Sequence, residues 1–289
     1  MAAAGTGASF GLAAAAIWGG ADFTGGLAAR RAPSLYVVAV AHSLSLLVLL
    51  ALLPLTHEVW PGLPAMLLPL LGGLAGGLGL MLFYHALSIG VMGLTAVVTG
   101  LTTACVPVLF EFATEGLPKP IQLAGFAVAA LSLWLITRTT DVSSTREAEI
   151  LPLLLGLGSG VCFGLMMISL KVSATSHGIF WMLSAARLGS VILTSTLLIW
   201  RFTVRQKKTE APMPGWILLS IVAGVLDTSG NLLFILATRV GRLDIASILS
   251  SLYPAGTILL AGLILHEHPT RRQWAGIALA MAAVVLVTI

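Results

Sequence analysis

The sequence predicts an all-α integral membrane protein whose ten transmembrane helices form two inverted five-helix repeats. Three observations support this fold class. Of the 289 residues, 58% are hydrophobic and only 9% are charged, whereas about a quarter of the residues in a soluble domain are charged. Apolar runs of about 20 residues, which cross a bilayer as a helix, recur along the whole chain. A residue pattern in the first half also returns in the second half.

Proline, glycine and charged residues separate the apolar runs and define the expected helices. The first five are expected at residues 8–29, 34–55, 64–88, 93–113 and 120–138. The second five are expected at residues 150–172, 178–200, 213–237, 243–265 and 272–289. The segment between the two sets is polar, so we expect a first repeat at 1–138, a linker at 139–149 and a second repeat at 150–289.

The two halves share residues as well as helix number. Gln122 and Gly125 in the fifth helix match Gln273 and Gly276 in the tenth, at an offset of 151 residues. The first helix of each half has a small residue at every fourth position, namely Gly11, Ala15 and Gly19 in one and Gly156, Gly160 and Gly164 in the other. Such small-residue faces allow helices to pack closely in lipid. Because each repeat has an odd number of spans, the second copy is expected to be inverted relative to the first.

Three features together resemble the EamA-like branch of the drug/metabolite transporter superfamily. They are Trp18-Gly19 in the first helix, the segment 83–87 (FYHAL) at the end of the third, and an acidic turn before Gln-x-x-Gly in the fifth and tenth. The resemblance covers nearly the whole chain. It implies ten helices in two repeats, transport of small molecules, and a central cavity lined by helices 1, 3, 4, 6, 8 and 9. Family members move chemically diverse metabolites, so the substrate does not follow from the resemblance.

The membrane orientation is predicted differently by charge and by resemblance. Ten Lys and Arg residues follow odd-numbered helices, whereas four lie at even-numbered connections and adjoining helix ends. The positive-inside rule therefore places both termini outside the cytoplasm. The resemblance implies termini that face the cytoplasm. In either orientation, we expect a multi-pass protein of the plasma membrane, which in bacteria is the inner membrane.

Polar residues within the spans are the candidates for a substrate site, because a charge at the bilayer centre costs about 2.5 to 3.5 kcal/mol on insertion scales. Trp18 and Asp22 are four residues apart and share one face of the first helix. Together they offer a cation an aromatic ring and a carboxylate. Asp227 and Asn231 repeat this spacing in the eighth helix. The alternative role of each pair is structural, through packing or hydrogen bonds between helices.

Five further residues complete the expected substrate-binding set: Tyr84, His85, Glu111, Arg187 and Tyr253. His85 and Tyr84 lie near the end of the third helix, and Glu111 lies one turn after a proline in the fourth. Arg187 lies well inside the seventh helix, where a carboxylate from the substrate or from the protein must pair with it. Tyr253 precedes a proline in the ninth helix and combines a phenol with a local helix break.

We expect a secondary transporter of small organic metabolites, with export of amino acids or related metabolites, that works by alternating access. The alternative is a proton-coupled exporter of lipophilic or quaternary cations of the multidrug type. Proton coupling is expected through Asp22, Glu111 or Asp227, with uncoupled facilitated flow as the other possibility. The expected partners are a small-molecule substrate and the lipid bilayer. Because the sequence has no catalytic, metal-binding or nucleotide motif and its basic residues lie in loops, we expect no enzyme activity, metal, cofactor or nucleic-acid partner.

Overall fold

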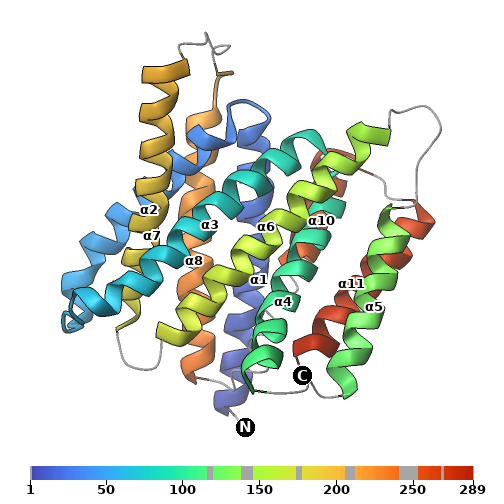
Figure 1. The fold of residues 1–289 in the computed structure, drawn as a ribbon, viewed down its shortest axis with the longest axis horizontal. Coiled ribbons are helices and arrows are strands. Elements are labelled where there is room, and N and C mark those ends of the chain that lie inside the picture. Colours follow the sequence, from blue (N-terminus) through green and yellow to red (C-terminus); the bar gives the residue numbers. More distant parts are fainter. Residues whose placement is uncertain are drawn as a thin grey trace.

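The computed structural model describes residues 2–115, 120–137, 146–173, 178–205, 212–240, 253–267 and 270–288. All regular structure in these ranges is helical, and both ends of the chain lie at the lower edge of Figure 1. The helices are α1 (Ala2–Ala29), α2 (Ser34–Thr56), α3 (Leu63–Ile89), α4 (Met92–Glu115), α5 (Pro120–Thr137), α6 (Arg146–Ser173), α7 (Ile179–Trp200), the π-helical turn η1 (Arg201–Arg205), α8 (Trp216–Val240), α10 (Tyr253–Ile264) and α11 (Arg271–Thr288).

The observed bounds agree with the expected helices to within two residues, apart from the starts of α1, α6 and α8 and the end of α8, which lies at Val240 and not at 237. α1 begins at Ala2, six residues before the expected start. α6 begins at Arg146, so the end of the expected linker is helical. α8 begins at Trp216, because Gly215 before it has a positive φ of 83°. Residues 243–252 of the ninth expected helix and 139–145 of the linker lie outside the described residues.

The helices have the composition of membrane spans. Within the described residues, five are long and apolar enough to cross a membrane, at 34–56, 63–89, 150–170, 179–203 and 216–234. Shorter apolar helices cover 92–107, 120–132, 253–264 and 274–286. Many large apolar side chains are exposed, including Leu55, Leu218 and Leu263, as expected for surfaces that face lipid. The chain is therefore a multi-pass membrane protein.

Tryptophans mark the ends of these spans. Six lie within a few residues of a helix end or in a loop, namely Trp60, Trp134, Trp181, Trp200, Trp216 and Trp274. Indole rings at such positions match the aromatic belts of membrane proteins, where an amphipathic ring lies at the headgroup level. Trp18 is different, because it lies eleven residues before the end of α1 and is therefore deep within the span. An interface role does not explain its position.

Glycines allow α3 to pack closely between α6 and α7. Gly72 and Gly76 face Ser169 and Met166 of α6, while Gly73 faces the backbone carbonyl of Ala186 in α7. A Cβ atom at any of the three glycines would overlap these neighbours. Elsewhere, α1 packs on α8 and α10, α4 packs on α6, and α5 packs on α11 at one side of the bundle (Figure 1). The close helix contacts thus bring several spans to one central region.

One end of the bundle is filled by apolar side chains. We call it the upper end, as drawn in Figure 1, where α1 ends and α2 begins. Its buried cluster includes Phe83, Tyr84, Leu87 and Met92 from α3 and α4. At the same end, the Glu267 carboxylate accepts hydrogen bonds from Arg30 Nη2 (3.3 Å) and from the backbone N–H groups of Met92 (3.3 Å) and Gly93 (3.4 Å). These contacts tie the end of α1 to the start of α4 and close the upper end.

The contact between Gly73 and Ala186 gives a test of the helix packing. Gly73→Ala is expected to cost about 1–3 kcal/mol of stability, because its new methyl group meets backbone atoms that have no rotamer to change. The measurement is thermal unfolding of the purified protein in detergent. Gly158→Ala is the matched control in α6, since the nearest atom to its Cβ is Leu82 Cδ1 at an ordinary 3.6 Å. The melting temperature of Gly158→Ala should equal or exceed that of the wild type. If Gly73→Ala and Gly158→Ala melted at the same temperature, the close packing of α3 against α7 would be contradicted.

Candidate functional site

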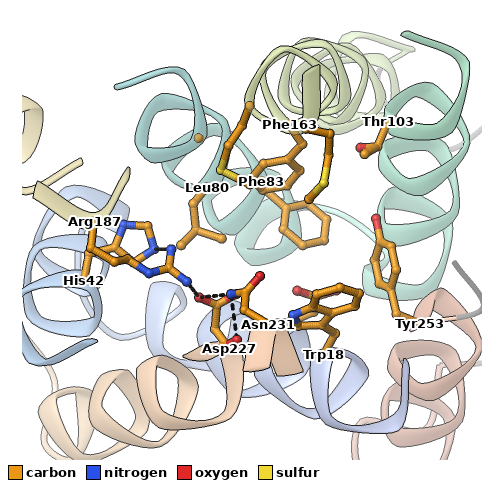
Figure 2. Close-up of a pocket in the computed structure, with 14 residues that line it drawn as sticks. Trp18, His42, Leu80, Phe83, Thr103, Phe163, Arg187, Asp227, Asn231 and Tyr253 are labelled. Carbon is orange, nitrogen blue, oxygen red and sulfur yellow. Dashed lines mark hydrogen bonds and ion pairs between the residues drawn. The ribbon is translucent and has the colours of Figure 1, made fainter. Parts of the chain in front are cut away.

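A cavity lies in the middle of the bundle and holds about 630 Å³ of empty space, including the part open to its surroundings (Figure 2). Asp227 lies on the cavity wall about 16 Å along α8 from its start, at 1.5 Å per residue, which is near the middle of this helix. The lining residues are Trp18, Asp22, His42, Gly76, Leu80, Phe83, Thr103, Phe163, Met166, Met167, Arg187, Asp227, Asn231 and Tyr253.

The polar end of the cavity is a hydrogen-bonded network from α2, α7 and α8. The Arg187 guanidinium forms an ion pair with Asp227, and the two side chains are only 10% and 22% exposed. Arg187 Nη1 also lies 3.0 Å from His42 Nε2, and His42 Nδ1 is hydrogen-bonded to Ser190 Oγ. Asn231 Nδ2 donates to the backbone carbonyl of Asp227 at 2.8 Å and to its Oδ2 at 3.4 Å. Each charged or polar group of this network thus has a partner.

The network fixes the protonation of His42. A guanidinium can only donate hydrogen bonds, so His42 Nε2 must accept the bond from Arg187. The ring proton is therefore on Nδ1, which donates to Ser190 Oγ. His42 is neutral in this arrangement. Among the described lining residues, the positive charge of Arg187 is consequently matched by the negative charge of Asp227.

The opposite end of the cavity is aromatic. The Trp18 indole lies edge-to-face against Tyr253, with ring centroids 6.3 Å apart and an interplanar angle of 81°. It also packs on Phe234 of α8, at a centroid distance of 5.7 Å. Gly230 leaves the space for the indole, since a Cβ there would overlap it. Figure 2 shows the Tyr253 hydroxyl directed toward Thr103 of α4.

Apolar side chains from α3 and α6 cover the cavity between its two ends. Phe83 and Phe163 pack edge-to-face with centroids 6.0 Å apart. Met166, Met167 and Leu80 complete this wall. Thioethers are polarizable and adapt to irregular ligands, which suits a site for an organic molecule with an apolar body.

Asp22 is the unusual group in the cavity. It lies one turn from Trp18 on α1, and its Oδ2 atom is buried with no hydrogen-bond partner among the described residues. Its carboxylate interacts electrostatically with Asp227 at the polar end and with Tyr253 at the aromatic end. A buried polar atom without a partner is costly, and in native proteins it usually has a functional explanation.

Six of the nine expected site residues line this cavity: Trp18, Asp22, Arg187, Asp227, Asn231 and Tyr253. Tyr84 instead lies in the apolar cluster at the upper end, where its ring covers Gly25. His85 is exposed and does not line the described cavity. Glu111 lies in α4, but its side chain is outside the described residues.

The cavity also has lining residues outside the expected substrate-binding set, of which His42 is the ionisable one. His42 of α2, together with the expected Arg187 of α7, adds two helices to the six implied by the family resemblance. His42 carried the same signal as the other candidates, since it is an ionisable residue within an apolar span. For Phe163, Met166 and Met167 there was no such signal in the sequence, because apolar residues that face a cavity are of the same types as those that face lipid.

The ion pair at the polar end gives a second test. Arg187→Met is expected to cost about 3–5 kcal/mol of stability, since it leaves the Asp227 carboxylate buried without its cation. The double variant Arg187→Met/Asp227→Asn removes both charges and is expected to recover most of that loss. Denaturant unfolding of the wild type, both single variants and the double variant gives the coupling energy. Purely additive losses would show that the two charges do not interact.

Comparisons with known proteins agree with this architecture. A crystal structure matches 98% of this chain and 97% of its own chain, with a TM-score of 0.65 and 16% sequence identity, which shows a shared fold. No curated protein matches the chain significantly. The model of the EamA-like transporter family matches residues 150–289, which are 140 of the 289 residues. This part of the chain is similar to the EamA-like transporter family, a family of the drug/metabolite transporter superfamily.

Proposed function

We propose that the chain is a secondary transporter of small organic metabolites that works by alternating access in the plasma membrane, which is the inner membrane if the cell is bacterial. The observation that carries this proposal is the cavity near the middle of the spanning helices, with ionisable and aromatic side chains from both halves of the chain. Secondary transporters bind their substrates near the bilayer midplane, between structural repeats. Members of the EamA-like family are transporters, which supports the same conclusion.

The packing of the helices supports two inverted repeats. If α1 to α5 correspond to α6, α7, α8, α10 and α11, then the α1–α8 pair corresponds to the α6–α3 pair. Likewise, the α1–α10 pair corresponds to the α6–α4 pair, and the α3–α7 pair corresponds to the α8–α2 pair. All six pairs are in contact. The chain enters α1 at the lower edge of Figure 1 and α6 at the upper edge, so these two helices run in opposite directions. This exchange symmetry is what a two-fold axis in the membrane plane produces.

Two close contacts follow the same symmetry. Gly19 of α1 approaches the backbone carbonyl of Tyr253 in α10, and Gly164 of α6 approaches Val106 of α4. Tyr253 and Val106 each directly precede a proline. Pro107 lies inside α4, where it removes a helix hydrogen bond and provides a local break at which the helix can bend. Pro254 lies in the first described turn of α10, where a proline removes no such bond.

The closed upper end defines the movement that transport requires. The apolar cluster around Phe83 and the hydrogen bonds of Glu267 separate the cavity from that side. Opening toward the upper side therefore requires the ends of α1, α3 and α4 to move apart. No ATP-driven step is needed, since a solute or ion gradient drives such an exchange.

Alternating access predicts that one cavity position can be reached from both sides of the membrane. Thr103→Cys places a thiol on the cavity wall, in a background where Cys105 and Cys162 are replaced by alanine. A membrane-impermeant maleimide should label it both in right-side-out cells and in inside-out vesicles. Ser132→Cys is the control, because Ser132 is fully buried in α5 outside the cavity and should be protected on both sides. Labelling of Thr103→Cys from one side only would contradict alternating access.

A further inference from the structure

We infer that the cavity recognises an organic cation, an ammonium or quaternary nitrogen on an apolar or aromatic body, and that Asp22 is the residue that binds its charge. This inference rests on the proposed transport function and names the substrate class for the same cavity. Three properties of the described lining residues carry it: their charge balance, the surroundings of Asp22, and the chemistry of the walls.

The charge balance favours a cation. The described lining residues include two carboxylates, Asp22 and Asp227, but one guanidinium, that of Arg187. Arg187 is already paired with Asp227, and its hydrogen bond makes His42 a neutral acceptor. When Asp22 is ionised, its negative charge has no positive partner among these residues. A cationic ligand supplies the missing positive charge, whereas an anionic ligand increases the imbalance.

The surroundings of Asp22 place that charge next to a ligand site. Its Oδ2 is buried without a hydrogen-bond partner in the described residues, although it belongs to a side chain that lines the cavity. Trp18, one turn away on the same face of α1, contacts Tyr253 across the aromatic end. A cationic group beside Asp22 therefore lies close to both a carboxylate and two aromatic rings, whose faces attract positive charge. Attraction between cations and aromatic rings strengthens where water is excluded.

The walls favour an organic cation over a metal ion. Ca²⁺ takes six to eight oxygen ligands, and Mg²⁺ also demands a shell of oxygen atoms. Here the walls between the two ends consist of the rings of Phe83 and Phe163 and the thioethers of Met166 and Met167. Such surfaces solvate a hard metal ion poorly and pack well against hydrocarbon. The cavity therefore suits a charged nitrogen attached to an apolar group.

The same geometry favours the binding of an amine over that of an amino acid. An amino acid also brings a carboxylate, which needs its own cation in the cavity. Arg187 would have to share its single positive charge between this carboxylate and the buried Asp227, which weakens its pairing with Asp227. A simple amine makes no such demand. We therefore expect an amine to bind more tightly than the amino acid that carries the same side chain.

The experiment compares three ligands that share one phenylalkyl group: phenethylamine, L-phenylalanine and 2-phenylethanol. Binding to the purified full-length chain in detergent is measured by calorimetric titration at pH 7. Phenethylamine is expected to bind at least about tenfold more tightly than either of the others, since it alone pairs with Asp22 and brings no carboxylate. Equal or tighter binding of L-phenylalanine or of 2-phenylethanol would overturn the inference, as would displacement of the amine by an equal concentration of Na⁺.

Variants then test the assigned residues. Asp22→Asn is expected to weaken phenethylamine binding about tenfold or more, without lowering the melting temperature, because Oδ2 has no partner to lose among the described residues. Trp18→Leu should weaken binding several-fold, whereas Trp18→Phe should retain most of it. Thr95→Val is the matched control, since Thr95 Oγ1 is also buried and unpartnered in the described structure but lies outside the cavity. Unchanged affinity in Asp22→Asn would overturn the assignment.

Failure of this inference can be distinguished from failure of the proposed function. Labelling of Thr103→Cys from both membrane sides does not depend on the substrate. If that labelling is two-sided and phenethylamine does not bind, the cation inference is wrong and the transporter proposal stands. If labelling is one-sided, the transport mechanism is wrong, whichever ligand binds.

Discussion

The ion pair between Arg187 and Asp227 is the interaction on which the centre of the molecule depends. A single charge at this depth in a bilayer is costly, and a paired charge is tolerated only when its remaining hydrogen bonds are satisfied. His42 and Asn231 supply those bonds, so α2, α7 and α8 are held together by one polar network. Because the network satisfies itself, the Asp22 carboxylate on α1 is the charge left to act on a ligand.

Close helix packing makes this network possible. The axes of packed helices usually lie 8–10 Å apart. Eight helices can all line one small cavity only if some of them approach one another more closely than this. In α3 the glycines supply that approach, with Gly73 against α7 and Gly76 against α6. On α1, Gly19 brings the backbone against α10, and Gly230 of α8 makes room for Trp18. The small residues thus determine which large side chains meet at the centre.

The helices could be predicted from the sequence because their signals are local: apolar runs of sufficient length, interrupted by proline, glycine and charge. Three of the six site residues could be predicted for an equally simple reason, since the charged side chains of Asp22, Arg187 and Asp227 are too costly to face lipid. Trp18, Asn231 and Tyr253 could be predicted from their helical spacing or from the neighbouring proline. Whether each remaining residue lines the cavity depends on how its helix is rotated about its own axis, which the local sequence does not determine. Tyr84 and His85 are adjacent in sequence, yet one is buried in the upper cluster and the other is exposed. No property of the single residue distinguishes Met166 in the cavity from a methionine that faces lipid.

The position of Asp22 also links ligand binding to helix movement. When Asp22 on α1 is ionised, it and Asp227 on α8 repel one another, although their two helices pack together along much of their length. A cation beside Asp22 would weaken this repulsion and attract the aromatic end, where Trp18 of α1 contacts Tyr253 of α10. Binding would thus draw α1 toward helices of the second half. Since α1 also forms part of the upper cluster that closes the cavity, a change in its position acts directly on the barrier that transport has to open.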